Sequence, residues 1–262
     1  MTDVELPLPT FLIIGAQKSA TRWLRVHLGE HPQIFTARSE AEFFDRHFDD
    51  GVNAYRQAFV GWDGPPFVGE STPGYMMWRN DPSVIAARIQ ETLSDVKLLA
   101  ILRDPVDRAF SAFCHHISRG RLPVDARLLD VVRSQRPETD PLSLISGGWY
   151  AASLEPYIER FGDRLLVVLH DAVHQSPHEL YRSTVAHVGA DPAFLPRNLE
   201  EVLFSTEGML PAGASGTETD GIRRQLRGRE RMVLYEYFAD EIVRLEKLLG
   251  LDLARWKIES AA

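Results

Sequence analysis

The stretch Phe11–Leu24, FLIIGAQKSATRWL, constrains the fold of this chain more than any other. Its four apolar residues 11–14 predict a short buried strand, which Gly15 ends. Residues 20–29 then predict a helix. A strand, a tight turn with a lysine and a helix start form an anion-binding device, because N–H groups and the positive helix end converge there. The sequence therefore predicts a phosphate loop around Lys18.

This loop differs from that of common nucleoside triphosphate sites. The Walker pattern G-x-x-x-x-G-K-[ST] requires a Gly-Lys pair, because the glycine lets the backbone approach the phosphates. Only two residues separate Gly15 from Lys18, and the chain contains no Gly-Lys pair. The pattern indicates a phosphate loop of another kind.

Apolar runs and helical patterns alternate along the rest of the chain, which predicts an α/β fold with a central, mostly parallel sheet and helices on both faces. We expect a single domain over residues 1–262, with residues 1–9 flexible and residues 203–221 forming a lid or mobile loop. The expected strands are Phe67–Glu70, Val96–Leu102 and Arg164–His170, and the expected helices are Pro82–Leu93, Val106–Arg119, Asp125–Ser134, Ser146–Phe161, Pro177–Val188 and Ile222–Leu249, with Gly250 ending the last.

Charge and cysteine content limit the function classes. The net charge of −8 argues against a nucleic-acid partner. The single cysteine, Cys114, excludes an internal disulfide framework and suits a reducing compartment. No segment has the pattern of a signal peptide, and no apolar run approaches the ~20 residues that span a bilayer. We expect a cytoplasmic protein without a membrane span.

A second motif, RDPVDRAFS, follows the central predicted strand at residues 103–111. Asp104 predicts a helix cap, and Arg103 lies at the carboxyl end of the strand, where open α/β sheets bind ligands. Arg103 and Ser111 together can hold a second phosphate, the arginine by forked charge-assisted bonds. An arginine paired with Asp104 or Asp107 is the alternative interpretation.

These two segments together resemble the PAPS-dependent sulfotransferases, where PAPS is 3′-phosphoadenosine 5′-phosphosulfate. Residues 15–24 resemble the 5′-phosphosulfate loop of that family, and residues 103–111 resemble its 3′-phosphate motif. Lys18 and Arg103 lie 85 positions apart, each after a predicted strand. The resemblance covers residues 10–190 well and the C-terminal helix loosely.

Further segments resemble the heparan sulfate group of this family. Residues 70–75, ESTPGY, are similar to its motif E-K-[ST]-P-x-Y, and residues 39–44, SEAEFF, are similar to its acceptor-side motif K-E-x-x-F-F. Residues 148–154, GWYAASL, also fit. The resemblance implies a bacterial enzyme that acts on a small molecule.

The resemblance implies PAPS as the sulfate donor, its desulfated form PAP as the product, and no metal. A lysine and a helix start aimed at the departing phosphate oxygen stabilise the transition state more than the ground state, which suits Lys18 as a catalytic residue. Tyr150 is a candidate for stacking near the adenine. The nucleotide-binding residues expected are Lys18, Ser19, Ala20, Thr21, Arg22, Trp23, Arg103, Ser111 and Tyr150.

An acceptor hydroxyl also needs a general base. The resemblance implies Glu40, since it matches the glutamate of K-E-x-x-F-F, and neighbouring phenylalanines can raise its pKa by desolvation. Glu42 competes with it, and His115 or His116 is the alternative because histidine is the base in another branch. The acceptor-side residues expected are Glu40, Phe43, Phe44, Ser71, Tyr75 and His115, with core packing as the alternative for the two phenylalanines.

Several positions depart from the heparan sulfate pattern. Ser39 and Ser71 replace its lysines, and residues 213–220 carry no Lys or Arg where that group has a basic loop. The chain therefore lacks the positive charge that a sulfated polysaccharide demands. The glycine usual after the loop lysine is replaced by Ser19-Ala20, which fits a negative φ there.

These features predict a sulfotransferase that moves the sulfuryl group to a hydroxyl or amine of a small molecule, glycolipid or saccharide, with a homodimer left open. A nucleotide kinase-like phosphotransferase is one alternative, although the missing Walker pattern disfavours it. A catalytically inactive nucleotide-binding homologue is the other. Intact Lys18, Arg103, Ser111 and Glu40 argue against it.

Overall fold

The computed structural model describes residues 5–135, 140–200, 226 and 228–257. The chain divides into two compact units. The sheet unit comprises Met1–Leu102 and Pro156–Leu203, and the helical unit comprises Arg103–Glu155 and Phe204–Ala262. The expected single domain over residues 1–262 stays a prediction.

A five-stranded parallel sheet forms the centre of the sheet unit, in the order β2-β3-β1-β4-β5. The two central strands are apolar and buried along nearly their whole length, as expected of strands covered on both faces. The strands are β1 (Phe11–Gly15), β2 (Ile34–Thr36), β3 (Phe67–Ser71), β4 (Lys97–Leu102) and β5 (Leu165–Leu169).

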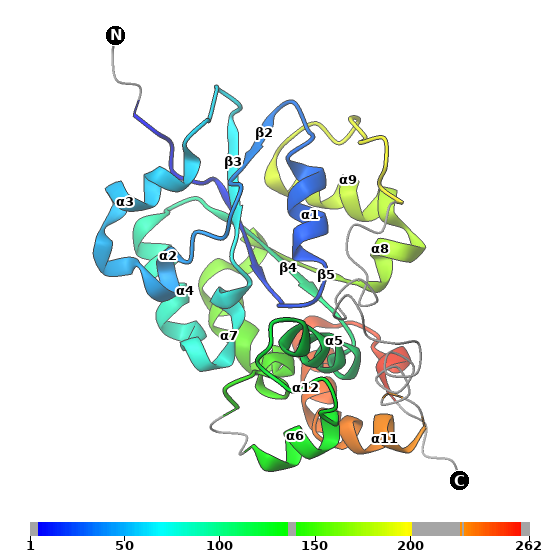
Figure 1. Cartoon of the computed structure of the whole chain (residues 1–262). Helices are drawn as coiled ribbons and strands as arrows, with labels where there is room; N and C mark the ends of the chain where they lie inside the picture. Colours follow the sequence, from blue (N-terminus) through cyan, green and yellow to red (C-terminus); the bar gives the residue numbers. More distant parts are fainter. Residues whose placement is uncertain (1–4, 136–139, 201–225, 227, 258–262) are drawn as a thin grey trace. The chain divides into compact units, whose positions relative to one another are not determined.

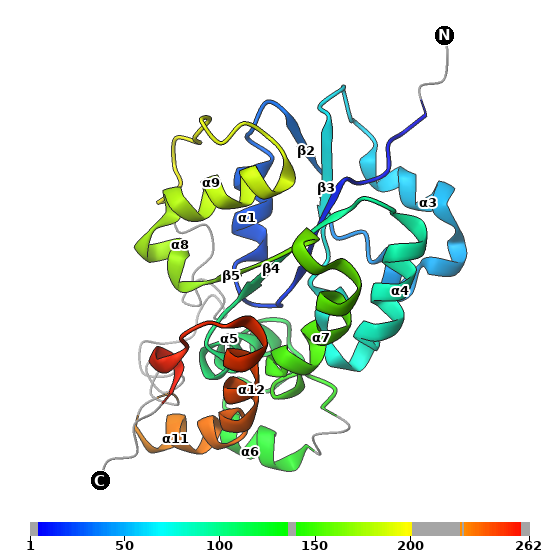
Figure 2. The ribbon, with the colours of Figure 1, turned by 180° about the vertical axis from the view of Figure 1, so that it is seen from behind.

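Helices cover both faces of this sheet (Figures 1 and 2). One face carries α1 (Thr21–Leu28), α8 (Asp171–Gln175) and α9 (Pro177–Val188). The other carries α4 (Pro82–Thr92) and the C-terminal half of α7 (Tyr150–Phe161). The predicted α/β fold with a parallel sheet and helices on both faces is confirmed.

Strand alternation explains how the two faces are filled. Phe11 and Ile13 of β1 point to the α1 and α9 side, where Leu24 and Val185 join the same buried cluster. Successive side chains alternate between faces, so Leu12 and Ile14 point to the opposite side, and both are fully buried.

The remaining elements of this unit are α2 (Phe43–Arg46), α3 (Val52–Arg56), η1 (Phe48–Asp50), η2 (Gln57–Phe59), η3 (Pro73–Met76), η4 (Trp78–Asn80) and η7 (Gly162–Arg164).

The described part of the helical unit contains helices and no strand. The Ala152 N–H donates to Glu241 Oε1 at 3.0 Å, and Arg244 pairs with Glu155. These bonds join the N-terminal half of α7 to α12. The elements of this unit are α5 (Pro105–Ser118), α6 (Leu128–Ser134), η6 (Ser146–Gly148), α11 (Arg229–Glu236), α12 (Ala239–Leu249) and η9 (Ala254–Trp256).

The structure corrects one expected helix, confirms where it ends and adds a strand that was not predicted. The predicted helix over Ile222–Leu249 is wrong in its described part, because α11 ends at Glu236 and α12 begins at Ala239. Its end is confirmed, since Gly250 caps α12 with a left-handed φ of 64°. The three residues of β2 gave too short a pattern to be predicted.

The expected flexibility of residues 1–9 stays a prediction. Arg56 of α3 pairs with Glu5 at 3.0 Å and donates to the Leu6 carbonyl. The expected lid, residues 203–221, lies outside the described residues.

Candidate functional site

The candidate residues of the sheet unit follow three neighbouring strands. Since β2, β3 and β1 run parallel, their carboxyl ends share one edge of the sheet. The predicted phosphate loop follows β1, the Glu40 segment follows β2, and Ser71 ends β3. The fold therefore brings the phosphate loop and the candidate base segment to the same edge.

The phosphate loop begins at a glycine that packing requires. A Cβ on Gly15 would lie 2.7 Å from the Met76 Cβ, closer than side chains approach. After the loop, α1 begins at Thr21, and its first internal hydrogen bond runs from the Leu24 N–H to the Ala20 carbonyl at 3.1 Å. No side chain among the described residues caps this helix end, and its first turn holds no acidic residue. Such an end suits an external anion.

The backbone of the loop departs from the sequence expectation. Ala20 has a φ of 70° and Lys18 a φ of 68°, so the negative φ that would make Ser19-Ala20 tolerable does not occur at Ala20. An alanine in this region costs about 1–2 kcal/mol relative to ordinary helical backbone. Glycine would adopt it without that cost.

Ser19 and Trp23 are both buried, with different consequences. The Ser19 Oγ has no hydrogen-bond partner in the described part of the chain, while its N–H donates to the Ala16 carbonyl at 3.2 Å. The Trp23 side chain packs in the apolar cluster below α1, with its ring 4.7 Å from that of His27. The nucleotide-binding role predicted for Trp23 stays a prediction, and its side chain lies in the core. Thr21 is buried and Arg22 exposed at the helix start.

Glu40 lies exposed on the segment after β2. Partial desolvation raises its pKa, and the carboxylates of Glu42 and Asp45 raise it further, against Arg25 and Arg46. Arg25 of α1 also donates to the Ala37 carbonyl at 2.7 Å. This bond ties the segment to the helix that starts at the phosphate loop, and a raised pKa suits a general base.

The aromatic residues predicted on the acceptor side belong to the core. Phe43 and Phe44 are at most 2% exposed, and the Phe43 ring stacks on Tyr55 at 4.3 Å. Tyr75 is fully buried, and Ser71 at the end of β3 is 4% exposed. Packing encloses these four side chains, as the core alternative for the phenylalanines expects, and their predicted acceptor contacts stay predictions.

Sequence reasoning missed Glu70 as a functional candidate. Its carboxylate lies on β3, fully buried, and accepts hydrogen bonds from Thr72 Oγ1 at 2.7 Å and from the Tyr55 hydroxyl at 3.3 Å. Burial raises its pKa to about 7, against hydrogen bonds from Thr72, Tyr75, Tyr55 and the Ala41 N–H. A glutamate within a predicted buried strand was the available signal, because lone buried carboxylates are rare.

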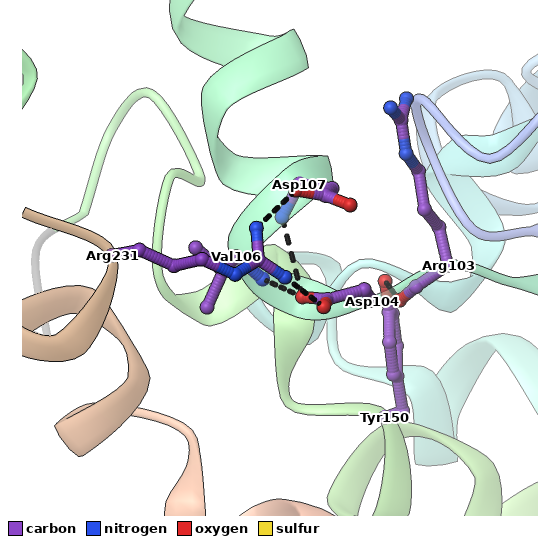
Figure 3. A network of polar contacts seen from close by, with 6 residues as sticks. All are labelled: Arg103, Asp104, Val106, Asp107, Tyr150 and Arg231. Carbon is purple, nitrogen blue, oxygen red and sulfur yellow. Dashed lines mark hydrogen bonds and ion pairs between the residues drawn. The ribbon is translucent and has the colours of Figure 1, made fainter. Parts of the chain in front are cut away.

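In the helical unit, Tyr150 supports Arg103 (Figure 3). Tyr150 is 2% exposed, and its hydroxyl donates to the Arg103 carbonyl at 2.9 Å. Its ring is enclosed in this structure, and the predicted stacking of Tyr150 near the adenine stays a prediction. Its observed contact fixes the main chain of Arg103, which follows directly on β4 in the sequence.

Side chains already occupy the hydrogen-bonding groups at the start of α5 (Figure 3). Asp104 Oδ1 accepts from the Val106 N–H at 2.8 Å and the Asp107 N–H at 3.3 Å. Arg231 of α11 pairs with both Asp104 and Asp107. In the alternative interpretation Arg103 pairs with Asp104 or Asp107. Arg231 would compete with it, because Arg231 already pairs with both carboxylates.

Burial and charge pairing have opposite effects on the pKa values of Asp104 and Arg231. Burial raises the pKa of Asp104 to about 6, with Asp107 adding to the shift and Arg231 opposing it. Desolvation would lower the pKa of Arg231, yet its two carboxylate partners raise it. Asp104 is only 6% exposed, so its carboxylate is poorly hydrated although Arg231 pairs with it.

The other α5 candidates lie within the same helix. Ser111 is 2% exposed, and His115 is half-buried. His116 bonds through Nε2 to the Leu142 carbonyl at 2.9 Å, as a structural histidine does. The roles predicted for Ser111 and His115 stay predictions.

The described residues lack two features, a metal-binding cluster and a membrane-spanning helix. They contain no cluster of three or more His, Cys, Asp or Glu side chains arranged to bind a metal ion. They also include no helix that combines the length and apolar character needed to cross a bilayer.

Curated proteins that are similar to this chain in sequence are sulfotransferases. Heparan sulfate glucosamine 3-O-sulfotransferase 3B1 of Mus musculus is 34% identical over 178 residues, which are 67% of this chain and 45% of the relative. Membrane-associated sulfotransferase kil1 of Dictyostelium discoideum is 36% identical over 112 residues, covering 41% of this chain and 23% of the relative. The chain spans less than half the length of these curated relatives. No family model matches the sequence.

A solved structure matches over nearly the whole chain. The crystal structure of a sulfotransferase from Alicyclobacillus acidocaldarius has a TM-score of 0.75 and 26% identity, and covers 95% of this chain and 99% of that one. The sequence resemblance and the structural similarity therefore agree. The homologues of this chain, in sequence and in structure, are sulfotransferases.

Proposed function

We propose that this chain catalyses transfer of a sulfuryl group from PAPS to a hydroxyl or amine of a small acceptor. The observation that carries this proposal is the lysine-bearing loop between β1 and a helix start that no described side chain caps. Its sulfotransferase homologues support the same reaction.

The main chain from Ser19 to Arg22 and the Thr21 hydroxyl bind the 5′-phosphate in this proposal. The buried Ser19 Oγ, which has no partner among the described residues, fits a site that completes its hydrogen bonds with a ligand. Arg103 and Ser111 bind the 3′-phosphate, as the sequence resemblance implies. PAPS, when bound, supplies the sulfuryl group.

Lys18 and Glu40 perform the chemistry. Glu40 accepts the acceptor proton, while Lys18 stabilises the negative charge on the oxygen that leaves with the nucleotide. The raised pKa of Glu40, due first to desolvation, suits this role. Glu42 is the weaker candidate because Arg46 pairs with it at 3.3 Å.

The proposed acceptor carries little negative charge. Three carboxylates, those of Glu40, Glu42 and Asp45, lie near one another on this segment. Desolvation is the main cause that raises the pKa of Glu40 and of Asp45, and the charge of Glu42 raises both further. Ser39 and Ser71 stand where the resembling motifs have lysines. Like charges repel, so heparan sulfate, the acceptor in the name of one relative, is not carried over to this chain.

Two measurements test this function. Calorimetry compares binding of PAP with binding of ATP plus Mg²⁺. Turnover with PAPS is then screened by mass detection of sulfate on four probe acceptors: 4-methylumbelliferone, hexanol, hexylamine and N-acetylglucosamine. We expect binding of PAP over ATP and sulfation of at least one probe.

Other results point to the alternatives. Binding of ATP with Mg²⁺ in preference to PAP would favour a kinase-like enzyme. PAP binding without sulfate transfer across a wider acceptor library would favour an inactive homologue. A homodimer and a cytoplasmic location remain separate predictions, which sedimentation and cell fractionation test.

A further inference from the structure

A buried hydrogen-bond network links β3 to the peptide that follows Glu40. Thr72 Oγ1 donates to Glu70 Oε2 at 2.7 Å and accepts the Glu42 N–H at 3.2 Å. The Thr72 hydroxyl therefore connects the Glu42 N–H to the buried carboxylate of Glu70 through two hydrogen bonds.

Two more amides reach the same carboxylate. The Ala41 N–H bonds to Glu70 directly, and the Tyr75 hydroxyl both bonds to Glu70 and accepts the Phe43 N–H at 3.1 Å. Three consecutive N–H groups, those of residues 41, 42 and 43, thus end on Glu70, directly or through one hydroxyl. Buried amides without such partners would be destabilising.

The peptide that this network holds has an unusual conformation. Glu42 adopts a left-handed φ of 48°, which side-chain-bearing residues rarely occupy. Such a backbone persists when its surroundings over-determine it, and clusters at functional sites. The three anchored amides supply that constraint directly after Glu40.

We propose that Glu70 is a positioning residue for the general base, fixing the main chain of residues 41–43 so that Glu40 is presented at the sheet edge. This inference rests on the proposed function, because it takes Glu40 as the base. It adds Thr72 and Tyr75 as the relays through which Glu70 acts.

The ionised form of Glu70 fits this arrangement. An ionised carboxylate only accepts, and Glu70 receives donors from Thr72, Tyr75, Tyr55 and the Ala41 N–H. Protonation would turn one of these acceptor sites into a donor. Burial favours that protonated form, so the network opposes the effect of burial.

The test compares Glu70→Gln with three variants of residues that bond to Glu70. Thr72→Val removes the relay hydroxyl, Thr72→Ser restores it, and Tyr55→Phe removes a hydroxyl that, among its described contacts, reaches Glu70 but none of the three amides. Hydrogen exchange at residues 41–43 reports the anchoring. PAP affinity and kcat with the reacting probe acceptor report function.

We expect Thr72→Val to speed amide exchange at residues 41–43 and to lower kcat at least about tenfold with PAP affinity unchanged, because small misplacements of catalytic groups are costly. Glu70→Gln should lower kcat about 100-fold if it folds. Thr72→Ser should restore both readouts to near wild type. Tyr55→Phe removes one donor to Glu70 but no anchored amide, so it should leave amide exchange unchanged and lower kcat less than Thr72→Val does.

Three results would overturn the inference: unchanged exchange in Thr72→Val, faster exchange with unchanged kcat, or a loss in Tyr55→Phe equal to that in Thr72→Val. A failure of the proposed function looks different. Glu40→Gln would then keep wild-type turnover, or the wild type would sulfate nothing, while amide exchange would still report whether Glu70 holds the segment.

Discussion

Two helices of this protein begin after a parallel strand, and their first turns are built in opposite ways. The start of α1 has Ala20 at the N-cap, no side-chain cap among the described residues and no acidic residue in its first turn. The start of α5 has Asp104 at the N-cap, Pro105 at N1 and Asp107 in the first turn. The start of α1 suits an external anion, whereas the start of α5 is capped by the carboxylate of Asp104.

The difference shows what each helix end can contribute to a ligand. The N–H groups of residues 106 and 107 already bond to Asp104, and Arg231 neutralises the carboxylates. Any anion at this motif must therefore be held by side chains such as Arg103 rather than by the helix end. At α1 the main chain itself is the candidate binding group.

Replacing Lys18 should have the largest effect on activity. Lys18→Ala should lower kcat about 10²–10³-fold, or about 3–4 kcal/mol of transition-state stabilisation, because the leaving oxygen loses its cation. Calorimetry should show less than a tenfold loss in PAP affinity. Lys247→Ala, which removes an exposed lysine on α12, is the control and should keep turnover within twofold. Full activity of Lys18→Ala would remove the catalytic role.

The capped helix start should show a pH signature. The pKa of Asp104 is raised from 3.8 to about 6, chiefly by burial, so the folded state retains a proton there that the unfolded state has lost. The free energy of unfolding should therefore fall as the pH rises from about 4 to 6, by about 3 kcal/mol from this group. Urea unfolding across that range should show a flatter profile for Asp104→Asn. Identical slopes in variant and wild type would contradict the raised pKa.

Giving α1 a carboxylate should make it resemble α5. Ala20→Asp places a negative charge at the helix start and should weaken PAP binding about tenfold, or about 1.4 kcal/mol, because the carboxylate repels the ligand and competes for the same N–H groups. Ala20→Asn, which tolerates the left-handed backbone without charge, is the matched control. Equal PAP affinity in the two variants would show that α1 does not contact the anion.

The smallest effect concerns the backbone of α1. Ala20→Gly should raise the free energy of unfolding by up to about 1 kcal/mol, because glycine relieves the left-handed strain but adds entropy to the unfolded chain. Ala87→Gly, inside α4, should instead lower it by about 1 kcal/mol. Thermal denaturation distinguishes the signs. A loss in Ala20→Gly similar to that in Ala87→Gly would mean that the strain is absent.

Local signals explain which elements were predictable. The strands β1 and β4 are continuous apolar runs between turn residues, and the pattern of α9 matched its bounds. Asp104 and Pro105 predict a helix start from two adjacent residues, and Asp104 caps α5 as expected. The break between α11 and α12 had no comparable signal, because apolar spacing continues across it.

The α/β fold, the phosphate loop and the family resemblance follow from the sequence, because they depend on neighbouring residues and on their order. What each side chain contacts depends instead on the tertiary structure. It enclosed Phe43, Tyr75 and Tyr150 in cores, and brought Arg231 to a helix start 127 positions earlier in the chain. It also placed Glu70 beneath the amides after Glu40, since only parallel pairing of distant strands brings those segments to one edge.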